Sequence, residues 1–154
     1  MDNAKCNALK EELAAQPEPR IVPIERFFDG NDDLGSIGCN LVNHPGLDAF
    51  RDVFAGLLRR PDVQSIHAQI AEVDPGEGSW PFTDTVLVVG AIPAEELRDA
   101  VGALQPDEVG TAKDLGIAPS HWVVSRVAGS TWTVPPGTAT LRSRLASSGA
   151  CASA

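Results

Sequence analysis

The residues best suited to bind a cation are clustered in one short acidic loop. Asp29, Asn31 and Asp33 stand at alternate positions with Asp32 between them, as do the first three ligands of an EF-hand calcium loop. The match ends there, because glycine falls at position seven (Gly35) rather than six, and position twelve holds an asparagine instead of a bidentate glutamate. A standard EF-hand is therefore excluded.

Three interpretations of this acidic loop remain open. A hard cation could sit among the oxygens in another geometry. The Asp and Asn side chains could instead hydrogen-bond their own backbone and stabilise a turn. In the third interpretation, Asp29, Asn31, Asp32 and Asp33 form a recognition loop for a basic protein partner.

Other side chains that could do chemistry are scattered. Cys39, His44, His67 and His121 lack the paired spacing of a zinc site. Cys39 falls on the inward face of a predicted strand, which favours a small buried side chain over a nucleophile. Phosphate-binding loops, dinucleotide fingerprints and serine elbows are missing from the sequence. We predict no catalytic residue, no metal ligand and no cofactor.

Hydrophobic periodicity defines the elements that position these residues. Helical spacing predicts helices over 3–16, around 24–28, over 47–58 and from Pro93 to 104, whereas alternating or continuous apolar residues predict strands over 36–42, 66–70, 85–91 and 121–128. The run from Val86 to Val89 is apolar without interruption, as in a strand covered on both faces.

The main elements follow one another as strand, helix, strand, strand, helix, strand. This order predicts an α+β fold, a ferredoxin-like βαββαβ sandwich in which an antiparallel four-stranded sheet carries two helices on one face. We expect residues 1–20 to be a flexible N-terminal segment with a short helix and residues 21–128 to be a single α+β domain. Residues 129–154 are mostly small and polar, which predicts a disordered tail.

Charge and cysteine content limit the compartment and the partners. The 154 residues carry 21 acidic and 12 basic side chains, a net charge of -9, which disfavours nucleic acid and anionic membranes. The sequence shows neither a signal-peptide core nor a stretch long enough to span a bilayer. The odd set Cys6, Cys39 and Cys151 does not form a disulfide framework, so we expect a cytoplasmic protein.

The sheet face away from the helices is the second candidate surface. Asn40, His67 and Gln69 fall on this face in the predicted fold. A single sheet with helices on one side leaves the other side open unless a homodimer mate, the tail or a partner protein covers it. Trp80 supplies a large ring in the loop between two strands, either packed at the core edge or presented as an anchor.

Three runs carry a resemblance to known sequences. They are 25–41 with His44-Pro45-Gly46, Trp80-Pro81-Phe82-Thr83-Asp84, and Gln105-Pro106-Asp107-Glu108-Val109. Over about residues 20–128 the chain resembles a family of small bacterial proteins of uncharacterised function. The resemblance implies no activity and assigns no role to these positions.

Two functional hypotheses follow. The first is a non-enzymatic cytoplasmic protein that holds a protein partner, or a second copy of itself, through the acidic loop and the open sheet face. An immunity or antitoxin-like role is one version of it, because opposite charge accelerates association with a basic toxin. The alternative is a small-ligand or divalent-metal protein, with or without catalysis, that uses the 29–33 loop.

Overall fold

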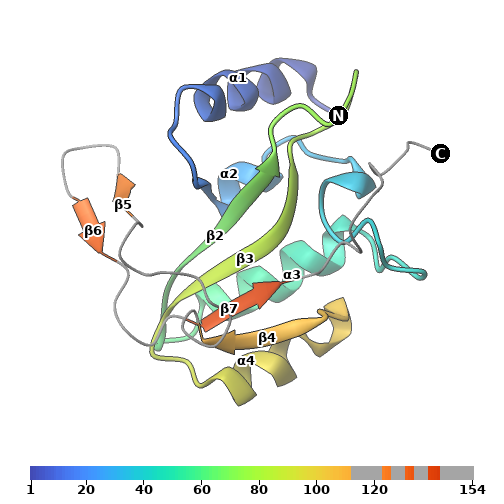
Figure 1. The fold of residues 1–154 in the computed structure, drawn as a ribbon. Helices are drawn as coiled ribbons and strands as arrows, with labels where there is room; N and C mark the ends of the chain where they lie inside the picture. The colour runs from blue at the N-terminus through green and yellow to red at the C-terminus, as the bar shows by residue number, and fades with distance from the viewer. Residues whose placement is uncertain (112–122, 126–130, 134–138, 143–154) are drawn as a thin grey trace.

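The computed structural model describes residues 1–111, 123–125, 131–133 and 139–142 (Figure 1). Helices and strands are mixed along the chain, and the main sheet is antiparallel. This confirms the α+β class. No helix in these ranges is long and apolar enough to cross a bilayer.

The elements alternate from the N-terminus onward. The helices are α1 (Asn3–Ala14), α2 (Ile24–Phe28), α3 (Leu47–Leu58) and α4 (Ala94–Val101), with short 3-10 turns at Leu34–Ser36 and Gly102–Leu104. The strands are β1 (Arg20–Pro23), β2 (Val63–Glu72), β3 (Phe82–Gly90), β4 (Glu108–Thr111), β5 (Val123–Ser125), β6 (Thr131–Thr133) and β7 (Ala139–Arg142). The four α-helices correspond to the four predicted helices. Strands β2 and β3 correspond to two of the predicted strands.

Strand order separates this sheet from the predicted one. The main sheet runs β1-β2-β3-β7-β4, and β5 pairs with β6 in a separate two-stranded sheet. A ferredoxin-like sheet has four strands with its first and third at the centre, whereas here β1 is an edge strand beside β2. The four-stranded ferredoxin-like arrangement is therefore not the arrangement observed, although the central position predicted for β3 is correct.

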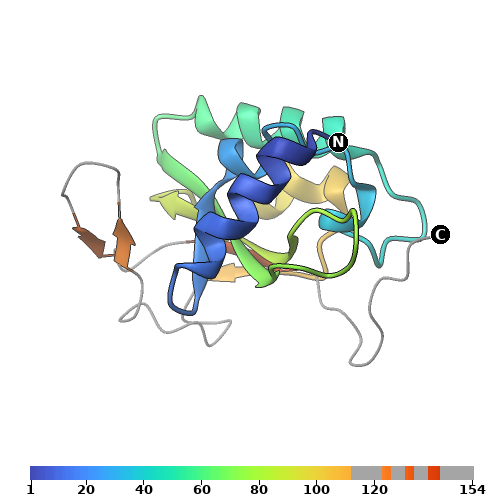
Figure 2. The same cartoon turned by 90° about the horizontal axis from the view of Figure 1, so that it is seen from above.

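One face of the sheet carries the hydrophobic core. Helices α2, α3 and α4 lie on the same side of the strands, and α1 crosses near the turn between β2 and β3 (Figures 1 and 2). Phe50, Phe54 and Leu57 of α3 are buried, because their three- and four-residue spacing puts them on one side of the helix. Leu9 and Leu13 of α1 are fully buried in the same core, so α1 is part of the packed body.

The strand predicted over 36–42 is wrong. Residues Leu34–Ser36 form a 3-10 turn, and Ile37 makes only an isolated bridge to Thr83. Gly38 then turns the chain with a φ of 65°, a conformation that L side chains rarely adopt. The alternation of apolar residues here therefore packs a loop against the core and does not build a sheet.

The predicted fourth strand and tail fall only partly within the described residues. Of the strand expected over 121–128, Val123–Ser125 forms β5, outside the main sheet. The disordered tail expected over 129–154 lies largely outside the described residues, but Ala139–Arg142 within it forms β7 between β3 and β4. Strands β3 and β4, which pair with β7, come from distant parts of the chain, so local composition does not predict that β7 forms a strand.

Candidate functional site

Asn31 is the centre of the acidic loop, and it is buried, with 1% of its surface exposed. Its Oδ1 accepts the backbone N–H of Asp33 at 2.9 Å, and its Nδ2 donates to Ser36 Oγ at 2.9 Å. Its backbone carbonyl accepts a hydrogen bond from the guanidinium of Arg51 on α3. Every polar group of the Asn31 side chain is therefore used inside the protein, as buried polar groups generally are.

Asp33 joins the same loop to the turn between β2 and β3. One carboxylate oxygen caps the 3-10 turn by accepting Gly35 N–H at 2.9 Å, and the other accepts Trp80 N–H at 2.9 Å. The Trp80 side chain is fully buried in the core. The sequence prediction that Trp80 contacts a partner is therefore wrong for this structure, and its core alternative is correct.

The two exposed carboxylates of the loop, Asp29 and Asp32, are paired with cations. Asp29 accepts a hydrogen bond from Lys5 Nζ on α1 at 2.6 Å, which lowers the pKa of Asp29 and raises that of Lys5. Asp32 pairs with the N-terminal ammonium. Gly30 must be glycine, because a Cβ there would lie 2.9 Å from Asp2 Cβ on a backbone with φ of 84°.

These contacts bear on the cation hypothesis. A divalent ion held by this loop would have to displace an ammonium from Asp29 and two backbone N–H groups from Asp33. Within the described ranges, no three His, Cys, Asp or Glu side chains are grouped closely enough to hold a metal ion. The loop geometry corresponds to the turn interpretation, in which the side chains serve the fold.

The sheet face away from the helices carries His67 and Gln69, as predicted. The register places Leu87 opposite His67 and Thr85 opposite Gln69. His67 is only 6% exposed. Its Nε2 lies 2.9 Å from Ser65 Oγ, while Nδ1 has no partner among the described residues. Burial lowers the pKa of His67, and the nearby Glu25 charge opposes this shift more weakly.

The residues predicted to contact a partner therefore separate into three groups. Asn31, His67 and Trp80 are buried, Asp33 and Gln69 are half-buried, and Asp29, Asp32 and Asn40 are exposed. The structure joins the acidic loop to Trp80 but places Asn40 on a different loop. No continuous surface is formed by the whole predicted set.

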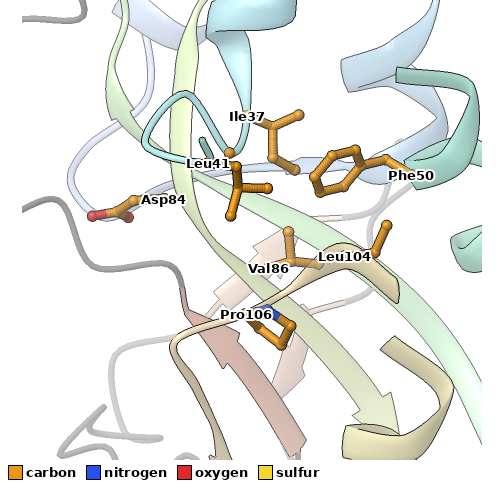
Figure 3. Close-up of a pocket in the computed structure, with 8 residues that line it drawn as sticks. Ile37, Leu41, Phe50, Asp84, Val86, Leu104 and Pro106 are labelled. Atoms are coloured by element: carbon orange, nitrogen blue, oxygen red, sulfur yellow. The ribbon is translucent and has the colours of Figure 1, made fainter. Parts of the chain in front are cut away.

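A small apolar slot lies beside Asn40, between the 37–41 loop, α3, β3 and the turn before β4 (Figure 3). The side chains that converge on it come from four segments: Ile37, Leu41, Phe50, Val86, Leu104 and Pro106. The Asp84 carboxylate lies at its rim and points away from them (Figure 3). The cavity volume is about 20 Å³, room for about one water molecule.

The loop that forms one wall of the slot is held by His44 and Asn40. His44 Nε2 lies 2.8 Å from Ile37 O, and Nδ1 accepts Gly46 N–H at 3.0 Å. Both ring nitrogens of His44 therefore serve the loop. Asn40 Nδ2 donates to Asp107 Oδ2 at 3.4 Å and so connects this wall to the opposite one.

Cys39 lies in the same wall and is half-buried and disulfide-bonded. The prediction of a free apolar cysteine on a strand is wrong. Cys6, by contrast, is free and buried on α1, where burial raises the pKa of its thiol. Low thiolate content makes Cys6 a poor nucleophile.

The slot is an apolar recess with one carboxylate, that of Asp84, among its lining residues. Pockets for metabolites usually enclose hundreds of Å³, so this slot is too small for one. Sequence reasoning missed the slot because Ile37 and Pro106, on opposite walls, are 69 residues apart in the chain. The one signal was that Ile37, Asp84 and Pro106 fall in the three runs of the resemblance, one in each.

Comparison with known proteins gives two matches. The family model described as "Uncharacterized protein YfbO family" matches residues 4–140. The Escherichia coli (strain K12) protein described as "Uncharacterized protein YfbO" is 30% identical over 93 residues, which are 60% of this chain and 64% of that protein. The match therefore spans less than two thirds of the relative's length. No solved structure is significantly similar.

Proposed function

Because the chain belongs to the uncharacterised YfbO family, no activity comes with its relatives, and we propose its function from its own surface. The protein is a non-enzymatic binding protein that holds a basic segment of a protein partner at the acid-rimmed slot. The predicted resemblance to an uncharacterised bacterial family is confirmed at that level. That the 25–41 run is the family's signature stays a prediction, as does the cytoplasmic location.

The observation that carries this proposal is the charge around the slot. Asp84 is one of the lining residues and accepts a hydrogen bond from Thr85 Oγ1 at 2.8 Å. Asp107 and Glu108 follow the lining residue Pro106 in the sequence, and Asp107 accepts from Asn40 Nδ2. Among the residues that the structure describes, no Lys or Arg lines the slot, and the whole chain carries a net charge of -9. A basic partner would therefore be attracted to this side, with an apolar side chain next to its cation packed against the mouth of the recess.

The partner-binding hypothesis is kept, but its binding surface is now the slot and no longer the acidic loop and the open sheet face. The acidic loop contributes only the exposed parts of Asp29 and Asp32, because Asn31 and Asp33 are bonded within the protein. Asn40, predicted as a partner contact, stands at the edge of the slot through its bond to Asp107. The second sheet face contributes little, since His67 and Leu87 are buried.

A peptide titration tests the proposal. The probe is a fluorescein-labelled Lys-Lys-Leu-Lys-Lys peptide, followed by anisotropy at low and at physiological salt under reducing conditions. We expect binding that weakens with salt and falls about tenfold in the Asp84→Asn/Asp107→Asn variant. Asp99→Asn, on the exposed face of α4, is the matched control and should bind as the parent does.

Two results would overturn the proposal. One is equal binding of a Glu-Glu-Leu-Glu-Glu peptide, which would show that charge plays no part. The other is unchanged binding by the Asp84→Asn/Asp107→Asn variant, which would place the site elsewhere. Light scattering adds a separate outcome, because a stable homodimer that buries Asn40 and Leu41 would replace the foreign partner with a second copy of the chain.

A further inference from the structure

Val42 is the most exposed of the large apolar side chains in the described residues. It is 97% exposed, compared with 53% for Leu34 and 36% for Met1. Single exposed apolar residues are common on protein surfaces, so exposure alone assigns no role to Val42. Its position is more informative, because Val42 directly follows Leu41, which lines the slot.

The loop that carries Val42 is braced on both sides of it. Before Val42, the Leu41 N–H donates to Gly38 O at 3.0 Å and closes a turn. After it, His44 Nε2 lies 2.8 Å from Ile37 O, and His44 Nδ1 accepts the backbone N–H two residues further on at 3.0 Å. Binding costs less when the contacting segment is already ordered. A partner can therefore contact Val42 with little further loss of conformational entropy in the loop.

The slot itself is too small to bury the apolar residue of a basic segment. Its volume of about 20 Å³ holds about one water molecule, so a leucine side chain stays outside it. Leu41 in the wall is half-buried and packs against the core. Val42 is the next side chain along the loop, and it is still in water. Contact with Val42 would remove apolar surface of both partners from water, which favours binding in proportion to the area.

Acidic side chains lie close to the same loop. Asn40, two residues before Val42, donates to Asp107 Oδ2 at 3.4 Å. Asp84 is one of the residues that line the slot together with Leu41. A peptide whose cations are attracted to these carboxylates therefore has its neighbouring side chains within reach of the loop that carries Val42.

We propose that Val42 is the residue that selects an apolar side chain in the basic segment of the partner. Asp84 and Asp107 attract the cations, and Val42 packs against an apolar side chain between them. A basic segment interrupted by an apolar residue is thus preferred to one of the same charge interrupted by a polar residue. The inference rests on the proposed function, because it assigns one more residue to the same site.

Two peptides of equal charge isolate this contact. The probes are fluorescein-labelled Lys-Lys-Leu-Lys-Lys and Lys-Lys-Ser-Lys-Lys, and the readout is the ratio of their dissociation constants measured by anisotropy. In the parent we expect the leucine peptide to bind about fivefold more tightly, and in Val42→Ser this preference should fall below about twofold. Val42→Ile keeps an apolar side chain and should retain the preference. Leu34→Ser removes another exposed apolar side chain and is the matched control, so it should retain the preference as well.

An NMR measurement on the parent observes the contact directly. The Val42 methyl signals, assigned by their loss in Val42→Ile, should shift at saturation with the leucine peptide and shift less with the serine peptide. Val42→Ser should unfold at the same urea concentration as the parent, because a side chain that is 97% exposed contributes little to the core. A changed peptide ratio then reports binding and not a loss of folded protein.

Three results would overturn the inference: a parent that does not discriminate between the peptides, an equal preference in the parent and in Val42→Ser, or Val42 methyl signals that do not shift. They are distinguishable from failure of the proposed function. If Asp84→Asn/Asp107→Asn weakens binding while Val42→Ser leaves the ratio unchanged, the charged site stands without Val42. A parent that binds neither peptide excludes both the site and the role of Val42.

Discussion

Replacement of Asp33 by alanine tests whether the acidic loop serves the fold. The variant loses the acceptor for Gly35 N–H and the acceptor for Trp80 N–H, both at 2.9 Å. A lost cap costs about 1 kcal/mol, and a lost bond to a charged acceptor costs about 1.5 to 3 kcal/mol. Because Asp33 is only half-buried, we take the lower part of that range and expect a loss of about 2 to 3 kcal/mol.

Urea unfolding followed by far-UV circular dichroism measures this loss. With a slope of about 2 kcal/mol per molar urea, the midpoint of Asp33→Ala should fall by about 1 to 1.5 M. Asp33→Asn keeps one acceptor oxygen, so its urea midpoint should lie between those of Asp33→Ala and the parent. Asp32→Ala is the matched control, because its carboxylate is 67% exposed and its pairing is at the surface, where ion pairs contribute little.

The comparison between the two neighbours is decisive. If Asp33→Ala unfolds at the same urea concentration as Asp32→Ala, the hydrogen bonds to Gly35 and Trp80 do not stabilise the loop, and its carboxylates would again be candidates for recognition. If Asp32→Ala lowers the urea midpoint more than Asp33→Ala does, burial does not decide which carboxylate stabilises the loop.

Three further outcomes are expected. Gly90→Ala should destabilise the protein strongly in the same urea assay, because its Cβ would lie 2.1 Å from the carbonyl oxygen of Asp62; a change under 1 kcal/mol would contradict this contact. Because burial lowers the pKa of His67 below 6.5, the unfolded state binds the extra proton. Stability is thus complete above pH 6.5 and falls below it, by at most about 1.4 kcal/mol per pH unit down to the lowered pKa. The His67→Phe variant should lose this part of the slope in melts between pH 7 and 5, and an unchanged slope would exclude His67 as its source. Calcium, magnesium or manganese should leave the melting temperature unchanged, since the 29–33 oxygens already accept protein donors; a rise of several degrees would support the cation hypothesis.

The elements that sequence patterns predict well are those whose burial is decided within one element. Phe50, Phe54 and Leu57 recur with the period of a helix, and α3 buries all three. The uninterrupted run at Val86 belongs to β3, which has neighbours on both sides. In each case the apolar side chains have only one way to reach the core.

The elements that were missed depend on contacts from elsewhere in the chain. β1 follows a proline-rich stretch, yet it pairs with β2 because Pro23 sits at its end and the missing N–H costs no ladder bond. The outward N–H of Ile21 is satisfied by Gln16 Oε1 at 3.3 Å, which blunts this sheet edge. Neither compensation is visible in a local pattern of hydrophobicity.

Local sequence patterns were also a poor guide to the candidate site. A run of acids close in sequence, Asp29 to Asp33, attracts attention as a surface, but its proximity is what lets Asn31 and Asp33 bond the loop's own backbone. Asp84 and Asp107 carry no such signal, because the fold alone brings them to one slot. Both carboxylates accept hydrogen bonds within the protein, Asp84 from Thr85 Oγ1 at 2.8 Å and Asp107 from Asn40 Nδ2 at 3.4 Å. A convergence of distant segments is visible only in the fold, and the slot between the 37–41 loop and Pro106 is such a place.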